Sequence, residues 1–271
     1  MPELPEVETL KRELARVLVG KKIKKVEGNF KLDLIGKKIV AIERRAKILI
    51  FTLHPPHSYL LAHLKMTGQL VYRGLSSVKV IGGHPEDPHK YTRAIIYFTD
   101  SSKLLFNDLR KFGWLKMVKE KDLPKYIGHL GPEPLSKDFT LENFKKILAR
   151  YPKRKIKQLL LDQSLIAGLG NIYVDESCFS AKILPTRIIK SLTPDNIQNL
   201  HQSIIAVLKL SIKKKGTSSR NYVRSNGQPG GMVPHLNVYG RGKEKCKKCG
   251  EKISKIKLNG RGTHFCSHCQ K

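Results

Sequence analysis

Acidic residues are scarce in this chain. Among its 271 residues, 22 are Asp or Glu and 52 are Lys or Arg, which gives a formal net charge of +30 at pH 7. Such an excess does not suit an enzyme for neutral small molecules, and it predicts a polyanionic partner. The few acids are unevenly placed, because four of the 22 fall within the first 13 residues. Local acidity in so basic a protein indicates chemistry rather than phosphate binding.

The chain also lacks long apolar runs, a leader peptide and internal repeats. No stretch approaches the roughly 18 uncharged apolar residues of a membrane-spanning helix, so nucleic acid is favoured over membrane as the polyanion. An acid already at position 3 excludes a signal peptide. Cysteine is limited to five residues, of which four form two C-x-x-C pairs and Cys178 stands alone. This usage suits a reducing cytosol and metal binding better than disulfides.

The first ten residues, MPELPEVETL, carry the most distinctive chemistry. A small second residue, Pro2, allows removal of Met1, and the mature chain would then begin with a secondary amine. An α-amino group titrates at about pH 8, so part of it is unprotonated and can attack a carbonyl-like carbon. In a helix starting here, Glu3 and Glu6 share a face near that amine, where a carboxylate can move the protons of imine chemistry. The alternative is an ordinary N-terminus with a solvated acidic first turn.

Hydrophobic periodicity predicts the fold of the N-terminal half. Apolar residues at helical spacing predict a helix over 3–19 that ends at Gly20. The region 22–118 consists mostly of short apolar or alternating runs, which are typical of an antiparallel sandwich or barrel. The predicted strands are 47–53, 59–66, 69–73, 93–100 and 103–108.

The pattern changes to helical spacing after residue 120. Residues 128–136 have the glycines and prolines of a linker, and Thr193 with Pro194 has the form of a helix start. Residues 217–235 are polar and rich in glycine, which predicts a mobile loop. The predicted helices are 141–150, 154–163 and 193–216.

The two C-x-x-C pairs predict a metal site near the C-terminus. Each pair can place two thiolates on one ion through a tight turn, and the spacer can form a hairpin that joins the pairs. Four thiolates complete a tetrahedral shell, so one Zn²⁺ would be structural. Basic residues dominate 241–271, which suits a hairpin that enters a nucleic-acid groove. The alternative is a loose redox dithiol pair. The predicted ligands are Cys246, Cys249, Cys266 and Cys269.

A glycine turn between two helices, at 166–171, is a candidate phosphate site. Gly168 and Gly170 let the backbone and a phosphate approach closely. Asn171 begins the second helix, where free amide donors favour an anion. Lys157 adds a cation on the preceding helix.

Six motifs occur in a fixed order along the chain. They are PELPEVET at the start, RRAK at 44–47, HLKMTG at 63–68, NDLRKFG at 107–113, DQSLIAGLGNIYVDE at 162–176 and the two C-x-x-C pairs. In these motifs, over nearly its whole length, the chain resembles the formamidopyrimidine-DNA glycosylase family of bacterial base-excision enzymes. The resemblance implies an α+β fold of two domains, with DNA between them. The N-terminal domain would be an antiparallel β-sandwich flanked by helices, and the C-terminal domain a helix–two-turn–helix domain with a four-cysteine zinc ribbon.

The corresponding domain boundaries follow the changes in pattern. They are 1–122 for the catalytic sandwich, 123–137 for a linker, 138–235 for the helical DNA-binding domain with a lesion-capping loop at 217–235, and 236–271 for the zinc finger.

The resemblance also implies roles for individual residues. Pro2 would be the Schiff-base nucleophile and Glu3 its proton donor and acceptor. Lys47, which alone could be a solvated hairpin lysine, would be a second catalytic amine that assists base departure and β-elimination. Arg261 in the zinc hairpin would contact phosphate and assist δ-elimination.

A further set would bind the DNA. Met66, Arg110 and Phe112 would fill the gap left by an everted base, although Met66 and Phe112 read alone are more often core residues. The expected substrate and DNA contacts are Glu6, Met66, Tyr91, Arg93, Arg110, Phe112, Lys157, Asn171 and Glu176.

Three positions depart from the family pattern. The segment 27–43 is shorter than usual, which removes no catalytic residue. Tyr91 and Arg93 stand where many members have two histidines, which puts one contact with the DNA backbone in doubt, although Arg93 can compensate. Leu109 replaces the usual proline before Arg110.

The resemblance therefore implies a bifunctional DNA glycosylase and abasic-site lyase of base excision repair. Because the bond between sugar and base is inaccessible in a stacked duplex, such an enzyme flips the nucleotide out. It would excise 8-oxoguanine and formamidopyrimidines from double-stranded DNA through an imine on Pro2, then nick the strand by β,δ-elimination. We expect a cytoplasmic, nucleoid-associated bacterial monomer with one structural Zn²⁺.

Two alternatives stay open. An endonuclease VIII-type glycosylase would act on oxidised pyrimidines, but the PELPEVE start and the long 217–235 loop favour the purine enzyme. A catalytically idle DNA-binding relative is the second alternative, and the intact Pro2, Glu3 and Lys47 argue against it.

Overall fold

The computed structural model describes residues 1–74 and 89–271. The chain forms two compact units, Met1–His129 with Ile212–Val233, and Leu130–Ser211 with Pro234–Lys271. Antiparallel sheets fill the first unit, while helices and a small hairpin fill the second, which confirms the predicted fold class. Within the described residues, no helix is both long and apolar enough to cross a membrane.

The grouping of the glycine-rich loop differs from the expected domain division. The expected division places 217–235 with the helical domain. The structure instead groups Ile212–Val233 with the first unit. The reason is a set of hydrogen bonds from the loop to the first helix and to one strand, which are described below. A loop anchored in this way also differs from the predicted mobile loop.

Helix α1 (Leu4–Leu18) confirms the predicted N-terminal helix. Pro5 lies in its first turn, where a missing N–H costs no intrahelical hydrogen bond, and the Glu6 carboxylate accepts the Glu3 amide at 2.8 Å. Apolar residues recur on one helical face and are all buried. They are Val7, Leu10, Leu14 and Leu18.

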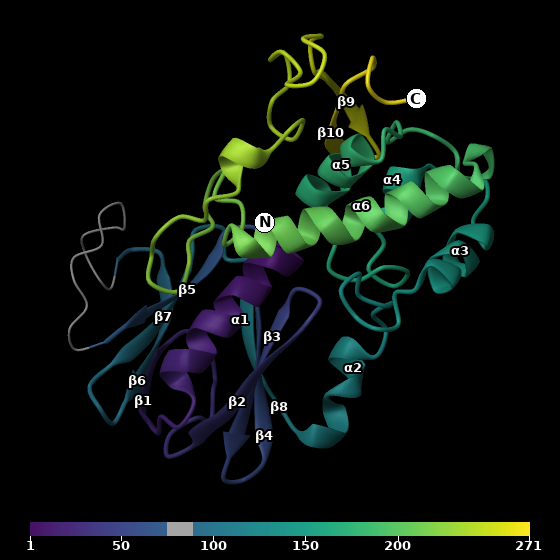
Figure 1. The fold of residues 1–271 in the computed structure, drawn as a ribbon. Helices are drawn as coiled ribbons and strands as arrows, with labels where there is room; N and C mark the ends of the chain where they lie inside the picture. Colours follow the sequence, from purple (N-terminus) through teal and green to yellow (C-terminus); the bar gives the residue numbers. More distant parts are fainter. Residues whose placement is uncertain (75–88) are drawn as a thin grey trace. The chain divides into compact units, whose positions relative to one another are not determined.

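Two four-stranded antiparallel sheets follow helix α1 in the first unit (Figure 1). Their orders are β2-β3-β4-β8 and β1-β6-β7-β5. The strands are β1 (Ile23–Gly28), β2 (Lys38–Arg45), β3 (Ile48–His54), β4 (Ser58–His63), β5 (Gly68–Arg73), β6 (Thr92–Phe98), β7 (Lys103–Asp108) and β8 (Trp114–Val118). The five predicted strands are confirmed to within a few residues. The strands β1, β2 and β8 escaped prediction because charged residues on their exposed faces interrupt the apolar pattern.

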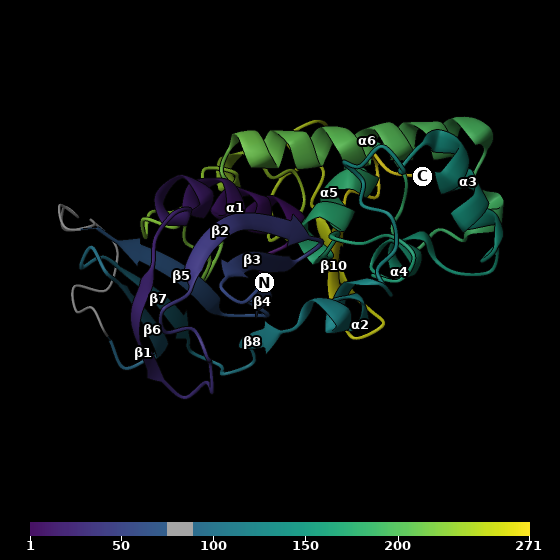
Figure 2. The same ribbon diagram turned by 90° about the horizontal axis from the view of Figure 1, so that it is seen from below.

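One hydrophobic core joins both sheets and α1. Phe51 from β3, Phe106 from β7 and Leu14 from α1 belong to the same buried cluster. Helix α1 packs beside β2, as both views show (Figures 1 and 2). Two separate sheets around one core are a sandwich rather than the barrel that the strand pattern also allowed.

Capping residues define where several of the helices after the sheets begin or end. The Thr140 hydroxyl accepts the Asn143 amide at 3.1 Å, and the Thr193 hydroxyl accepts the Asn196 amide at 3.2 Å, as predicted for the longest helix. The helix predicted over 154–163 is shorter than expected and covers Ile156–Leu160, where a C-cap at Leu161 ends it. The helices are α2 (Pro124–Ile127), α3 (Leu141–Ala149), α4 (Ile156–Leu160), α5 (Asn171–Ser180) and α6 (Pro194–Lys213).

Candidate functional site

The first turn of α1 surrounds the N-terminus with buried carboxylates. Glu3 is 2% exposed and Glu6 1% exposed, and Pro2 is buried behind an exposed Met1. Burial lowers the pKa of the Met1 amine below its ordinary value, while the negative charges of Glu3 and Glu6 oppose that lowering. A lowered pKa favours the unprotonated amine, which is the form that acts as a nucleophile. The solvated acidic turn that was the alternative does not fit this burial.

Two cations also act on the terminal amine. The positive charges of Lys47 and Arg220, after the larger effect of burial, further lower the pKa of the Met1 amine. Lys47 is itself only 6% exposed. The charge of the predicted Lys47 thus acts at the N-terminus, together with that of Arg220, which sequence reasoning missed. A single arginine in a glycine-rich loop gives no periodic signal.

A tight turn between β2 and β3 delivers Lys47. Ala46 adopts a φ of 52° in this turn, and the Arg44 guanidinium donates to the Ala46 carbonyl at 2.9 Å. The same guanidinium donates to Glu8 of α1 at 2.9 Å. Burial alone would raise the pKa of Glu8, but hydrogen bonds from Arg44 and Arg12 lower it below its ordinary value. The charged Glu8 therefore ties the RRAK hairpin to α1.

The Glu6 carboxylate accepts hydrogen bonds from backbone amides of the protein. One carboxylate oxygen accepts the Glu3 amide at 2.8 Å, and the other accepts the Thr217 amide at 2.8 Å. With both oxygens engaged and 1% of its surface exposed, Glu6 cannot be a direct DNA contact, and the expected role is corrected. Its position links the first turn of α1, here called the catalytic turn because it follows the predicted nucleophile Pro2, to the start of the 217–235 loop.

Met66, Arg110 and Phe112, here called the wedge residues, lie at the surface. Met66 is 40% exposed and Phe112 is 54% exposed, which excludes the core interpretation. The Arg110 guanidinium carbon lies 4.8 Å from the centroid of the Phe112 ring. Leu109, which replaces the family's proline, is also 45% exposed. Apolar side chains this exposed are typical of a surface that packs against a partner.

Asp108 supports the chain that carries two wedge residues. Its carboxylate accepts the Arg110 amide at 3.2 Å and the Gly113 amide at 2.7 Å, and it also bonds the Thr67 hydroxyl. It is 1% exposed, so these contacts satisfy a buried charge. Sequence reasoning missed Asp108. The signal was an aspartate at the end of a strand, just before a turn.

Tyr91 and Arg93 lie beside the same chain segment. The Arg93 guanidinium donates to the Asp108 carbonyl at 2.9 Å, and the Asp108 amide donates to the Tyr91 carbonyl at 2.9 Å. Both side chains are half-buried. Their contact with DNA stays a prediction.

His63 is a third residue that sequence reasoning missed. The Lys65 amide donates to its Nδ1 at 3.0 Å, so the neutral ring carries its proton on Nε2. Burial, followed by the charges of Lys65 and Lys47, lowers the pKa of His63 to about 3. His63 is therefore an uncharged hydrogen-bond donor at neutral pH. The signal was its place at the end of a strand inside the HLKMTG motif.

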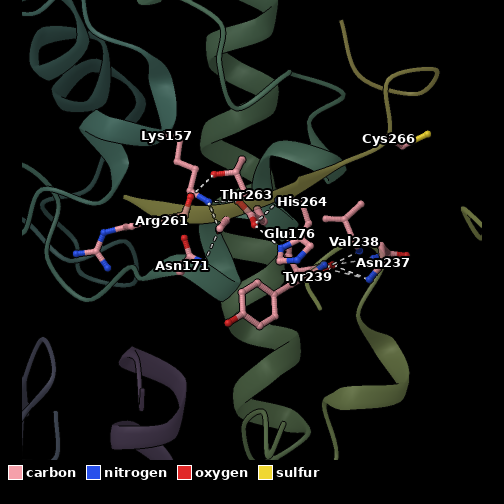
Figure 3. Close-up of polar contacts among 12 residues, drawn as sticks. Lys157, Asn171, Glu176, Asn237, Val238, Tyr239, Arg261, Thr263, His264 and Cys266 are labelled. Carbon is pink, nitrogen blue, oxygen red and sulfur yellow. Dashed lines mark hydrogen bonds and ion pairs between the residues drawn. The ribbon is translucent and has the colours of Figure 1, made fainter. Parts of the chain in front are cut away.

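In the second unit, Lys157 is paired inside the protein (Figure 3). Its ammonium donates to Asp175 at 2.6 Å and to the Gly262 carbonyl at 3.2 Å, and only 1% of Lys157 is exposed. Lys157 thus supports the fold, and its expected phosphate contact stays a prediction. Asn171 donates to the same Gly262 carbonyl at 2.8 Å. Because its amide nitrogen carries a second hydrogen, a phosphate contact of Asn171 stays a prediction.

Glu176 also serves the protein rather than DNA. Its carboxylate accepts the amides of Asn237, Val238 and Tyr239 at 2.8 to 3.0 Å, and only 1% of Glu176 is exposed. The expected DNA contact is corrected, since these amides engage both oxygens (Figure 3). Glu176 instead holds the segment that leads into the cysteine module.

The four predicted cysteines converge on one point. Their sulfur atoms all lie within 4.8 Å of one another, with Cys249 and Cys266 at 3.5 Å and Cys246 and Cys269 at 3.9 Å. A tetrahedral Zn²⁺ with bonds of about 2.3 Å has sulfur–sulfur edges of about 3.8 Å, so the donor set fits one zinc ion. A loose dithiol pair would not bring all four sulfurs together. Such a closed shell gives the zinc a structural role.

A two-residue turn presents Arg261 beside this module. Strands β9 (Ser254–Leu258) and β10 (Arg261–Phe265) pair antiparallel, and Asn259 and Gly260 between them have φ values of 48° and 75°. Positive φ at both central residues is the requirement of a type I′ hairpin. Arg261 is exposed and extends away from the polar contacts around Lys157 (Figure 3). Arg261 is therefore accessible, as its predicted contact with a phosphate requires.

A buried terminal amine on a β-sandwich, together with a helical unit that carries a four-cysteine zinc finger, defines a zinc-finger DNA glycosylase. Three family models match along the chain. Residues 1–115 match the formamidopyrimidine-DNA glycosylase N-terminal domain and residues 130–223 its H2TH domain. Residues 243–271 match the zinc finger found in FPG and IleRS. The chain belongs to the formamidopyrimidine-DNA glycosylase family.

Full-length relatives and solved structures agree with this membership. The formamidopyrimidine-DNA glycosylase of Desulfitobacterium hafniense is 40% identical, with 100% of both chains covered, and that of Lactococcus lactis is 43% identical, with 100% of this chain and 99% of the relative covered. A structure of a Lactococcus lactis variant with DNA is similar at a TM-score of 0.87 and 39% identity, over 100% of both chains. The Thermus thermophilus protein is similar at a TM-score of 0.87 and 35% identity, over 99% of this chain and 98% of that one.

Loss of one zinc ligand should release the metal. We expect Cys249→Ser to lower the zinc content well below the one ion per chain of the wild type, because small metal modules draw much of their folding free energy from the metal. Proteolysis should then cut within 243–271, while the β-sandwich stays folded. Metal analysis with Cys178→Ala as the matched control checks this, since Cys178 lies outside the cluster. Wild-type protein free of zinc after purification without chelators would contradict the assignment.

The Lys157–Asp175 pair should stabilise the second unit. Lys157→Met leaves Asp175 buried without its cation, which should lower the free energy of unfolding by about 3–5 kcal/mol. The double variant with Asp175→Asn removes both charges and should lose less. Urea unfolding followed by circular dichroism measures this, with Lys153→Met, at an exposed position, as the control. Unchanged stability combined with weaker DNA binding would support the phosphate contact instead.

Proposed function

We propose that this protein is a bifunctional DNA glycosylase and abasic-site lyase that removes oxidised purines in base excision repair. The observation that carries the proposal is the N-terminal turn of a chain of this family, where Pro2 and Glu3 are buried and the charges of Glu3 and Lys47 act on the terminal amine. Support for the substrate comes from related structures. The similar Lactococcus lactis proteins were crystallised with DNA containing Fapy-dG or an abasic site, and a further similar structure holds carbocyclic 8-oxo-G.

The proposed chemistry starts once Met1 is removed. The Pro2 nitrogen attacks C1′ of the flipped nucleotide, the bond between C1′ and the base breaks, and the base takes up a proton as it leaves. The C1′–O4′ bond of the sugar then breaks as the nitrogen lone pair forms a C1′ iminium, and the ring oxygen takes up a proton. Glu3 accepts and returns the protons of these steps, and Lys47 assists base departure and the later loss of a sugar proton. Loss of that C2′ proton expels the 3′ phosphate, and a second elimination expels the 5′ phosphate.

The lowered pKa of the terminal amine fits this order of events. A lowered pKa increases the unprotonated fraction of the amine, and that fraction can attack without first giving up a proton to solvent. The charge of Glu3 acts on the amine, and its carboxylate would take part in the proton transfers. A neutral His63 adds a hydrogen-bond donor that does not change charge over the working pH range.

Exposed and basic residues support DNA binding. The wedge residues would fill the space that the flipped nucleotide leaves, while Asn171 and Arg261 would contact phosphates. Tyr91 and Arg93 would contact the backbone near the wedge residues. The formal charge of +30 supports association with DNA in general, so we propose a cytoplasmic, nucleoid-associated monomer whose recognition depends on damage rather than sequence.

Covalent trapping tests the nucleophile. Borohydride should freeze a protein–DNA adduct on a duplex with one 8-oxoguanine, and mass spectrometry of the adduct should show that Met1 is absent. Pro2→Gly should form the adduct more than about tenfold more slowly, because it replaces the secondary amine. The same exchange at an exposed site, Pro124→Gly, is the control.

The substrate panel separates this function from its alternatives. Faster trapping on thymine glycol than on 8-oxoguanine or formamidopyrimidine would indicate an endonuclease VIII-type enzyme. A wild type that binds these duplexes and forms no adduct on any of them would indicate an idle DNA-binding relative. Pro2→Gly that traps as fast as the wild type would show that another amine is the nucleophile.

The wedge residues should matter for flipping more than for strand cleavage. We expect Phe112→Ala or Arg110→Ala to slow excision from duplex DNA by about 10- to 100-fold, since base–aromatic stacking is worth about 1–3 kcal/mol and offsets the cost of flipping. Cleavage at a preformed abasic site should fall much less, because no base must be extruded. Single-turnover rates on both substrates measure this, with Ile35→Ala as an exposed apolar control. Equal losses on both substrates would mean that these residues only support the fold.

A further inference from the structure

Helix α1 carries acids that bond the loop 217–225. Glu6 and Glu13 are seven residues apart, which places them two turns apart on the same helical face. Glu6 accepts the Thr217 amide at 2.8 Å, at the beginning of the loop. Two carboxylates on one face can therefore reach one segment at two separate points.

Glu13 holds the other end of this loop. Its carboxylate accepts the Ser225 amide at 3.1 Å, the Ser225 hydroxyl at 2.9 Å and the Arg224 guanidinium at 2.8 Å. The side chain of Glu13 is 12% exposed, so these bonds are poorly screened by solvent. Three donors on one carboxylate are more than a surface ion pair would need.

The strand β5 fixes the loop from its other side. The Tyr72 amide donates to the Ser225 carbonyl at 2.7 Å, and Gln69 donates to the Asn221 carbonyl at 2.6 Å. Tyr222 is 6% exposed and belongs to the hydrophobic core of the sandwich. In Figure 1 the segment that follows α6 accordingly runs beside β5.

Between these anchors, the loop exposes a short tip. Thr217 is buried and Tyr222 is buried, whereas Ser219 and Arg220 are exposed. The Ser218 hydroxyl donates to the Tyr222 carbonyl at 2.7 Å and closes the base of the tip. The two exposed residues are thus presented by a frame that is anchored on both sides.

The frame also connects the tip to the catalytic turn. The same Glu6 carboxylate that accepts the Thr217 amide accepts the Glu3 amide, next to Pro2. The positive charge of Arg220 contributes to the lowered pKa of the terminal amine, after burial. The tip therefore lies within electrostatic reach of the nucleophile.

We propose that Glu6 and Glu13 form a carboxylate clamp that presents Ser219 and Arg220 to the base that is being removed. Glu13 is then a positioning residue for the excision step, although it touches neither the amine nor the substrate. The assignment rests on the proposed function, because it is the flipped base that the tip would meet. Cleavage at an abasic site offers no base to the tip, so that step depends on Glu13 much less than excision does.

Glu13 variants in the full-length enzyme test the clamp. Glu13→Ala removes all three bonds, and it should slow excision of 8-oxoguanine by about tenfold, the effect of losing roughly one charge-assisted hydrogen bond, while abasic cleavage changes less than about twofold. Glu13→Gln keeps one acceptor oxygen and should recover part of the rate. The loss should appear in the single-turnover rate at saturating enzyme rather than in DNA affinity. Glu142→Gln, an exposed acid on α3, is the control.

Hydrogen exchange supplies a readout that does not need activity. The Ser225 amide should exchange faster in Glu13→Ala than in the wild type, while amides of the β-sandwich core stay protected. Faster exchange with unchanged excision would overturn the positioning role, and unchanged exchange would overturn the clamp itself. Equal losses on 8-oxoguanine and abasic DNA would mean general destabilisation and would also overturn it. If the wild type itself excises no oxidised base, the proposed function fails, while exchange still decides whether the clamp exists.

Discussion

The structure of the first unit depends on the acids of helix α1. In a protein with a formal charge of +30, a buried carboxylate has many possible cationic and amide partners, and each of three acids of this helix binds a different set. Glu6 binds the backbone of the catalytic turn and of the loop, and Glu8 binds Arg44 beside the turn that carries Lys47. Glu13 binds the far end of the loop. One helix therefore orders three segments that are far apart in the sequence around a single amine.

In the second unit, two adjacent buried acids, Asp175 and Glu176, also bind different sets of partners. Asp175 accepts Lys157 and the His264 amide, and Glu176 accepts three successive amides before the zinc module. Helix α5 is buried over nearly its whole length, so each of these charges must be satisfied inside the protein. The contacts attach the zinc hairpin to the helix and leave Arg261 exposed. Lys157 and Glu176, which the motifs identify as DNA contacts, therefore support the segments that carry exposed residues such as Arg261.

Sequence reasoning located the elements with strong periodicity and the residues with unusual chemistry. Helix α1, the five apolar strands and the capped helix at Thr193 were predicted because their patterns repeat along several turns or residues. The strands β1 and β2 were not predicted because one face of each carries charged residues, and β8 was not predicted because it is only five residues long and Lys116 interrupts it. The convergence of four cysteines followed from their spacing, since each C-x-x-C pair is a local structure. For the proposed catalytic residues, the family motifs implied the roles of Pro2, Glu3 and Lys47.

By itself, the sequence determined the fold class, the zinc ligands and the family, because those depend on local patterns and on motifs in order. Only the tertiary structure decided which charged residues face outward. Nothing in the sequence distinguishes Lys157, Glu176 and Glu6 from exposed binding residues. In the structure these three are buried and paired, whereas Arg261 and Phe112 are exposed. It also decided that the loop after α6 groups with the sandwich. The physical reason is that the partner of a buried charge can lie about two hundred residues away, as Ser225 does from Glu13, and no pattern along the chain records that distance.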